Sequence, residues 1–104
     1  MRRERLPPGI TRRRATLLAQ LVAAGSVSET VFEKGVRSSQ AWPSSDQPFT
    51  ATEARELRVM SVGGFVRTAR VAPFRTRYTA THAGRLFVEH WRPAFPGWPE
   101  AKAT

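Results

Sequence analysis

Apolar residues recur at helical spacing near the start of the chain, between Thr11 and Gly25. Thr11 is a candidate N-cap, because its hydroxyl can accept a hydrogen bond from an unpaired amide, and Gly25 is a candidate helix stop. The apolar stripe consists of Ala15, Leu18, Leu21 and Val22. This pattern predicts a first helix that begins at Arg12 and turns one face towards a core.

The next stretch, from Ser26 to Arg37, is short and allows two interpretations. Ser26 and Glu29 have the spacing of a capping box, which predicts a short helix with Val31 and Phe32 facing inward. A strand over residues 27–32 is the alternative, because the run is short for a helix. We expect the helix.

A third helical pattern starts at Thr50, which forms another capping box with Glu53, and ends at Gly63-Gly64. Its inward residues are Ala54, Leu57 and Met60. At about 100 degrees per residue, the residues on the opposite side are Thr52, Arg55, Arg58 and Val59. The exposed side of this helix is therefore expected to be basic.

Two β-prone runs follow, over residues 65–71 and 76–80, and the turn between them is Ala72-Pro73-Phe74-Arg75. This pattern predicts a hairpin. The arginines of the hairpin are Arg67, Arg70, Arg75 and Arg77. Thr81 is then the N-cap of a last helix, which Pro93 ends.

This order of helix, glycine turn, basic hairpin and closing helix resembles the winged helix-turn-helix DNA-binding domains of the MarR or PadR kind. Two motifs carry the resemblance. The first, Gly63-Gly64-Phe65-Val66, is similar to the Gly-Leu-Val that ends the recognition helix of such domains. The second, from Tyr78 to Gly84, is similar to Tyr-x-Leu-Thr-x-x-Gly, which closes the wing and caps the next helix.

The resemblance implies an α+β fold, mainly α: a winged helix with a three-helix core, a two-stranded basic wing and a closing C-terminal helix. It also implies that the helix over residues 50–62 enters the major groove of DNA. The chain departs from the family at residues 38–47, a serine-rich loop where such domains have a tight turn. We expect Trp42 to fill the core from this loop.

The length of the chain, 104 residues, is that of one small domain. We expect a basic flexible arm over residues 1–11, the winged-helix domain over residues 12–92 and a C-terminal tail rich in proline and aromatic residues over residues 93–104. Phe95 and Trp98 of this tail either cover the domain's own core, which is the default, or dock on a second copy or another protein. A monomer and a homodimer both fit the sequence.

The charge of the chain predicts an acidic partner. Lys and Arg outnumber Asp and Glu by 17 to 8, which gives a net charge of +9 and an isoelectric point near 11.7. Nearly all of these cations are arginine, whose planar fork pairs with phosphate or guanine, although a GC-rich genome would give the same bias. The candidate nucleic-acid-binding residues are Arg2, Arg3, Arg5, Arg12, Arg13, Arg14, Thr52, Arg55, Arg58, Arg67, Arg70, Arg75 and Arg77.

These candidates have two expected roles. Thr52, Arg55 and Arg58 face outward from the predicted recognition helix, where arginine can bond guanine in the major groove. The arginines of the arm, the first helical turn and the hairpin would hold phosphates or reach into a minor groove. We expect arm, recognition helix and hairpin to lie on one side of the domain, so that a duplex contacts all three together.

Other functional classes find no support in the sequence. The chain has no cysteine, which excludes disulfides, thiol catalysis and the usual zinc fingers. His82 and His90 lie about 160 degrees apart around one helix and cannot share a metal ion. No paired carboxylates, phosphate-binding loop or nucleophile motif occurs. We expect no enzyme, no cofactor and, since no apolar run could span a bilayer, a cytoplasmic protein without a membrane partner.

The sequence favours a small basic protein that binds double-stranded DNA, as a sequence-reading transcriptional regulator of a bacterium or mobile element. One alternative is a winged-helix interaction module of the phage or plasmid type, which inhibits an acidic protein partner. Another is a binder of RNA or single strands, which requires Phe65, Phe74 and Tyr78 to be exposed stacking platforms.

Overall fold

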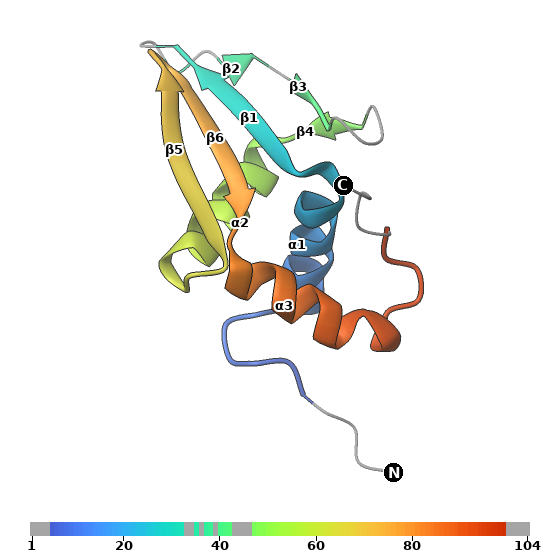
Figure 1. Ribbon diagram of the computed structural model, residues 1–104. Coiled ribbons are helices and arrows are strands. Elements are labelled where there is room, and N and C mark those ends of the chain that lie inside the picture. The colour runs from blue at the N-terminus through green and yellow to red at the C-terminus, as the bar shows by residue number, and fades with distance from the viewer. Residues whose placement is uncertain (1–4, 33–34, 36, 39, 43–46, 100–104) are drawn as a thin grey trace.

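The computed structural model describes residues 5–32, 35, 37–38, 40–42 and 47–99. Within these residues the chain forms three α-helices and an antiparallel sheet, with a short 3₁₀ turn over Arg92–Ala94 (Figure 1). The helices are α1 (Arg12–Ala24), α2 (Ala51–Val62) and α3 (His82–Trp91). The sheet has the order β2-β1-β6-β5 and consists of β1 (Ser26–Val31), β2 (Arg37–Ser38), β5 (Val66–Ala72) and β6 (Arg75–Ala80). A separate short pair is formed by β3 (Gln40–Ala41) and β4 (Pro48–Phe49).

The predicted fold, a mainly α winged helix with a three-helix core, is wrong. The expected middle helix does not form, because Ser26–Val31 is strand β1, which pairs with β6 on one side and β2 on the other. The protein has a mixed α+β fold. The predicted hairpin forms as β5 and β6, but β1 and β2 take the place of the expected middle helix, so the hairpin is part of a four-stranded sheet.

The pattern of burial explains why β1 is a strand. Val27 and Glu29 are buried, whereas Ser26, Ser28 and Thr30 are only partly buried, and this two-residue alternation is that of a sheet. Pairing on both sides also satisfies the backbone groups of β1. The capping-box spacing of Ser26 and Glu29 is therefore coincidental, and the alternative interpretation as a strand is the correct one.

The three helices begin where the sequence predicts. Thr11, Thr50 and Thr81 are their N-caps, and each hydroxyl accepts a hydrogen bond from a backbone amide of the first turn. The capping box of α2 is complete, because Glu53 Oε1 accepts from the Thr50 amide at 2.9 Å. After α1 the chain turns at Gly25 with a φ of 86°, a left-handed value that glycine adopts without strain.

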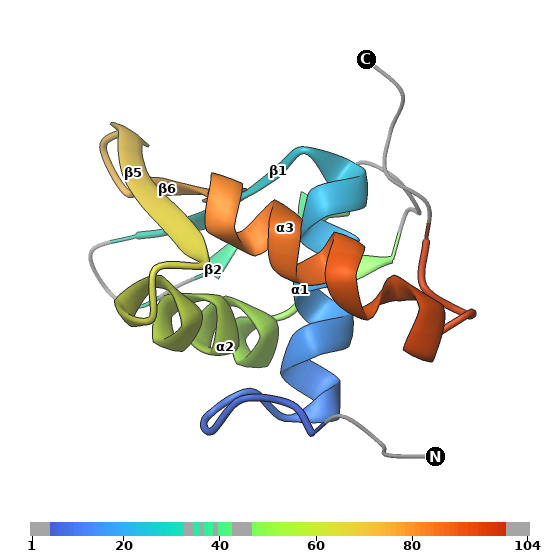
Figure 2. The same ribbon diagram turned by 60° about the horizontal axis from the view of Figure 1, so that its bottom comes forward.

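A single core joins the helices to one face of the sheet. Leu18 and Leu21 of α1 are fully buried, and α1 contacts α2, α3 and β6. Figure 2 shows α3 crossing α1, with α2 beside it. The buried residues of α2 are the predicted Ala54, Leu57 and Met60. Trp42 is 1% exposed, as expected, and its ring packs edge-on against Phe49.

The C-terminal tail folds back on the body of the protein. The rings of Phe95 and Trp98 stack with their centres 4.5 Å apart, and Trp98 is buried. The indole Nε1 of Trp98 donates to Thr16 Oγ1 on α1 at 3.0 Å. The interpretation that these two rings cover the domain's own core is confirmed, so they offer little surface to another protein.

The hairpin of β5 and β6 and the described part of the arm lie at opposite ends of the molecule. The hairpin projects past the helices and turns at Pro73-Phe74, whereas residues 5–11 lie beyond the start of α1 (Figures 1 and 2). The sequence predicted arm, helix and hairpin on one side of the domain. Residues 8–10 lie beside the end of α2 and beside Phe65 at the base of the hairpin, away from its turn, and Arg2 and Arg3 lie outside the described residues.

Candidate nucleic-acid interface

The four arginines predicted in the hairpin are all exposed. Every residue from Arg67 to Arg75 is exposed, and within β5 only Val66 is buried. The far half of the hairpin therefore meets solvent on both faces. None of Arg67, Arg70 and Arg77 forms an ion pair with an acid that the structure describes. These side chains are available to a partner from outside.

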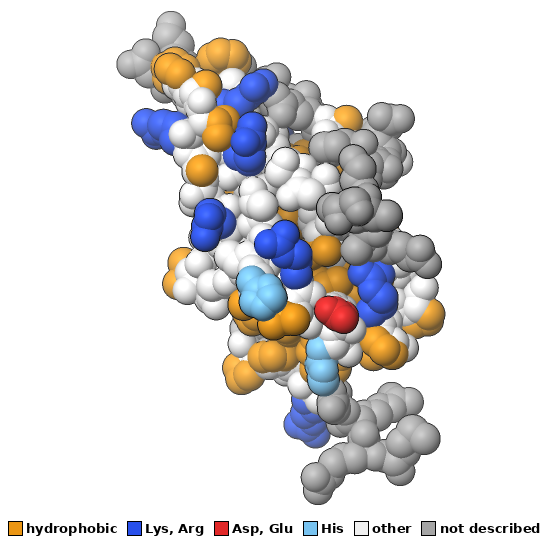
Figure 3. All heavy atoms as spheres, in the orientation of Figure 1, with side chains coloured by type: hydrophobic (Ala, Val, Ile, Leu, Met, Phe, Trp, Pro, Cys, Tyr) orange, Lys and Arg blue, Asp and Glu red, His pale blue; other side chains and the backbone are white. Residues whose placement is uncertain are grey.

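The strand register divides the hairpin arginines between the two faces of the sheet. Side chains directly opposite each other in paired strands share a face. Arg70 is opposite Thr76, which is opposite the buried Glu29, so Arg70 lies on the face towards α2. The arginines on the other face are Arg67, Arg75 and Arg77. Figure 3 views this second face and shows basic side chains along the hairpin and over the part of the molecule below it.

The acidic side chains that the structure describes do little to neutralise this surface. The structure describes four of the eight acidic residues of the chain. Glu29 is buried, Glu53 belongs to the cap of α2, and Glu56 forms an ion pair with Arg14. Only Glu89 among the described acids is exposed. The protein thus holds three of these four carboxylates in its own contacts and leaves most of its arginines outside.

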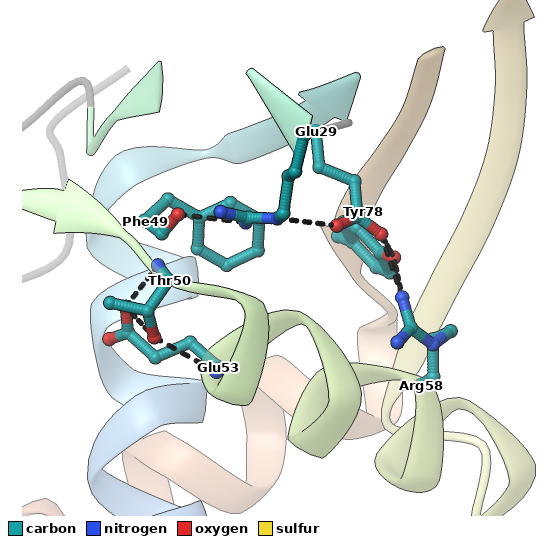
Figure 4. A network of polar contacts seen from close by, with 7 residues as sticks. Glu29, Phe49, Thr50, Glu53, Arg58 and Tyr78 are labelled. Carbon is teal, nitrogen blue, oxygen red and sulfur yellow. Dashed lines mark hydrogen bonds and ion pairs between the residues drawn. The ribbon is translucent and has the colours of Figure 1, made fainter. Parts of the chain in front are cut away.

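Glu29 is the centre of a buried polar network between the sheet and α2 (Figure 4). Its Oε1 accepts from Arg58 Nη1 at 2.7 Å and from the Tyr78 hydroxyl, and its Oε2 accepts from Arg37 Nε at 3.2 Å. Arg58 Nη1 also donates to the Tyr78 oxygen at 3.0 Å, and Arg37 donates to the Phe49 carbonyl at 2.8 Å. The network joins groups from β1, β2, β4, β6 and α2.

The network shifts two pKa values. Burial raises the pKa of Tyr78 from 10.0 to about 12, and its hydrogen bond to Glu29 adds to the effect. Burial lowers the pKa of Arg58, but its hydrogen bond to Tyr78 and the charge of Glu29 outweigh burial, so the pKa of Arg58 is raised. At neutral pH the network therefore contains a neutral tyrosine and a charged Arg58.

The outward side of α2 carries the three predicted base-reading residues, and their surroundings differ. Thr52, Arg55 and Arg58 all occupy exposed positions. Arg55 forms no ion pair with a described acid. Arg58 is tied to Glu29 and Tyr78, although its side chain is 52% exposed. A contact between Arg58 and a base would compete with these internal bonds, so Arg55 is better placed to reach a partner.

Two of the arginines predicted at the start of α1 are held by the protein itself. Arg14 forms an ion pair with Glu56 of α2 and donates to the Gly9 carbonyl at 2.7 Å. The guanidinium of Arg12 lies over the ring of Phe95, 5.4 Å from its centre. These contacts fasten residues near the arm and the tail to the helices, which is a structural role.

The remaining candidates near the N-terminus stand apart from the hairpin. Arg5 and Arg13 are exposed. They belong to the described arm and to the start of α1, which Figure 1 shows at the end of the molecule away from the turn between β5 and β6. The structure therefore brings the hairpin arginines together and separates them from those of the arm.

Of the three aromatic residues predicted as stacking platforms, one is exposed. Tyr78 is fully buried, and Phe65 is half-buried with its ring centre 5.2 Å from that of Phe87. Phe74 is 46% exposed. Sequence reasoning missed Phe32, which was expected inside and is 49% exposed. The signal for the exposure of Phe32 was the alternative interpretation of residues 27–32 as a strand, in which Phe32 is the last residue.

Other kinds of site are not evident in the part of the chain that the structure describes. Those residues contain no group of three or more His, Cys, Asp or Glu placed to hold a metal ion. None of their helices has the length and apolar character needed to cross a membrane.

Comparison of the chain with protein-family models, with curated proteins and with solved structures gives no match. The resemblance to MarR or PadR proteins therefore stays a prediction from the two motifs, Gly63-Gly64-Phe65-Val66 and residues 78–84.

Proposed function

We propose that the protein binds double-stranded DNA through the hairpin of β5 and β6. One observation carries the proposal: the hairpin stands clear of the helices with four exposed arginines, and every residue from Arg67 to Arg75 meets solvent. The net charge of +9 would draw the protein towards a polyanion from a distance.

The arrangement of the arginines suits phosphate contacts. Arg67, Arg75 and Arg77 share one face, and Arg70 lies on the other. Two rows of phosphates border each groove of a duplex, and two-stranded ribbons can lie in either the major or the minor groove. A hairpin with cations on both faces can meet both rows. Each contact would release a condensed counterion and contribute to affinity without selecting a sequence.

A duplex is favoured over a single strand by the aromatic residues. Binding of single strands depends on several exposed rings on which successive bases stack. Tyr78 is buried and Phe65 is half-buried, so the platform expected for single strands is incomplete. Arginine-to-phosphate contacts, which need no exposed bases, then supply the main attraction.

A sequence-reading role is the finer part of the proposal. Arg55 on α2 is the candidate that could bond a guanine edge, because it is exposed and free of described acids. With this contact the protein would act as a small cytoplasmic transcriptional regulator. Without it the protein would coat DNA of any sequence.

The test compares two variants that lose the same charge at different places. Arg67→Gln with Arg77→Gln removes two hairpin cations, and Arg5→Gln with Arg13→Gln removes two exposed cations at the other end. Affinity for pooled random duplex is measured by fluorescence anisotropy over a range of salt concentrations. The hairpin variant is expected to lower the steepness of the log-log salt dependence by roughly 1.8, since each lost phosphate contact removes about 0.9.

The control variant is expected to change the salt dependence by much less than the hairpin variant. Equal losses in the two variants would mean that net charge alone drives binding, and the hairpin would lose its assigned role. Absence of duplex binding by the wild-type protein at low salt would end the proposal.

A further inference from the structure

Large apolar side chains gather at the free end of the sheet instead of entering the core. Val31 is 38% exposed, Phe32 49%, Val71 41% and Phe74 46%. The rings of Phe32 and Phe74 have their centres 6.1 Å apart, and the Val31 amide donates to the Phe74 carbonyl at 2.8 Å. The end of β1 and the turn of the hairpin thus form one apolar tip. Exposed apolar groups of this size tend to mark contacts with a partner.

The backbone at Phe74 is a second, independent sign of a role outside the domain. Phe74 has a φ of 65°, and it is the only non-glycine residue with a positive φ among those described. Glycine or asparagine would occupy this left-handed turn position with less strain. Pro73 precedes it and is also exposed. The turn therefore keeps a half-exposed ring in a costly backbone conformation, a situation typical of functional positions.

The arginines around the tip indicate what kind of partner it meets. The tip ends a ribbon that carries Arg70, Arg75 and Arg77 on exposed positions, and Arg67 lies seven positions from Phe74. At about 3.3 Å per residue the arginines extend roughly 23 Å back from the tip. A tip that dips into a membrane surface enters only about 5–10 Å. A row of arginines that extends this far from the tip fits a groove of a duplex better, because phosphates border such a groove along its whole length.

We propose that the tip, Pro73-Phe74 with Phe32 behind it, is an apolar wedge that inserts at a base step of duplex DNA and bends the duplex. This inference rests on the proposed function, because the arginines must first hold the hairpin in a groove. Apolar side chains that enter a minor groove separate neighbouring base pairs and kink the helix axis. Flexible pyrimidine–purine steps would accept the wedge most easily. The wedge would give a shape preference that needs no hydrogen bond to a base.

The experiment uses the full chain and a short duplex with a fluorescent donor and acceptor at its two ends. Binding of the wild-type protein is expected to raise energy transfer, because bending brings the ends together. Phe74→Asn removes the ring and keeps a residue that tolerates the left-handed turn. This variant is expected to bind roughly tenfold more weakly, as for loss of one stacking contact, with an unchanged salt slope and no rise in energy transfer.

A matched control removes an exposed apolar side chain elsewhere. Leu86 on α3 is 51% exposed, so Leu86→Gln is expected to bend the duplex as the wild type does. Phe74→Gly, which relieves the turn completely, provides a second ring-free variant and is expected to behave like Phe74→Asn. Circular dichroism checks that each variant is folded.

The outcomes separate this inference from the proposed function. Binding of the wild type without a rise in energy transfer, or equal bending by Phe74→Asn, would overturn the wedge and leave the DNA-binding proposal intact. No binding to any duplex would overturn both. Sedimentation with vesicles of phosphatidylserine and phosphatidylcholine that is lost in Phe74→Asn, without bending of DNA, would also overturn the wedge and assign the tip to a membrane surface.

Discussion

Glu29 illustrates how a single residue sets the position of several elements. A carboxylate removed from water is costly unless charged and hydrogen-bonded partners surround it. Glu29 has such partners in Arg37, Arg58 and the Tyr78 hydroxyl. Because these groups come from β2, α2 and β6, they stay satisfied only when those elements pack as observed. The arrangement also explains why Arg58, an apparent surface cation in the sequence, points back to the sheet.

The pH dependence of stability should report the Tyr78 contact. In the folded protein the pKa of Tyr78 is about 12, whereas its ordinary value is 10.0. Between these two pH values the unfolded chain loses the phenolic proton and the folded protein keeps it. The unfolded state therefore binds fewer protons, and stability falls as pH rises. The contribution is fully present below pH 10 and is lost as the pH passes through about 12.

Urea unfolding of the wild type and of Tyr78→Phe at a series of alkaline pH values measures this effect. The wild type is expected to lose stability relative to Tyr78→Phe over that window. Tyr78 is the only tyrosine of the chain, so its ionisation can be followed directly from tyrosinate absorbance. A Tyr78 that ionises at its ordinary pKa in the folded protein would contradict the prediction.

At the scale of elements, the crossing of α3 over the start of β5 depends on Gly84. A Cβ at this position would lie 2.2 Å from the Phe65 carbonyl oxygen. The Thr81 amide donates to the same carbonyl at 3.1 Å, and the Thr81 hydroxyl accepts from the Gly84 amide. The cap of α3 and its close approach to Phe65 are thus one feature. It accounts physically for the spacing of threonine and glycine in the second motif.

Gly84→Ala is expected to destabilise the protein by about 1–3 kcal/mol, because the added methyl group forces backbone apart. Helix propensity alone would predict the opposite sign, a gain of about 1 kcal/mol. Gly97→Ala is the control, since a Cβ there has nothing within 4 Å. Thermal unfolding of the two variants decides the matter, and a stabilised Gly84→Ala would show that α3 can move away from Phe65.

The sequence predicted the elements whose signals are local, and its main error concerns a strand whose partners are distant. Helix starts at Thr11, Thr50 and Thr81 were correct, because a cap and its amide lie within one turn. Strand β1 was only the alternative to the expected helix, because its state depends on β6, far along the chain. The same holds for the candidate site. Exposure of the hairpin arginines followed from the pattern, whereas the contact of Arg58 with Glu29 joins residues 29 positions apart.

At the scale of the whole molecule, positive charge is divided between two ends. The hairpin occupies one end, and Arg5 and Arg13 lie near the other. A short straight duplex can therefore use the hairpin fully and gains little from the arm. Arg55 is exposed on α2, and α2 packs against β5, so this cation lies on an element that adjoins the hairpin.

This geometry separates affinity from selectivity. Arg55→Gln is expected to reduce preference among duplex sequences by about 1–3 kcal/mol at the base it contacts. The slope of the log-log salt dependence is expected to change by no more than about 0.9, the value for one phosphate contact. Selection of duplexes from a random pool, by wild type and variant in parallel, measures the preference. Unchanged selectivity in Arg55→Gln would remove α2 from the reading role and leave a protein that binds DNA of any sequence.

The hydrogen bond from the Val31 amide to the Phe74 carbonyl ties the turn of the hairpin to the end of β1. A ligand that displaces the turn would also displace β1, in which the buried Glu29 lies two positions before Val31. Movement of the turn would therefore disturb the buried Glu29 network, and a ligand bound at the turn would reduce the motion of both. Amide hydrogen exchange at Val31 should slow when the end is occupied, even though the site lies at the margin of the fold.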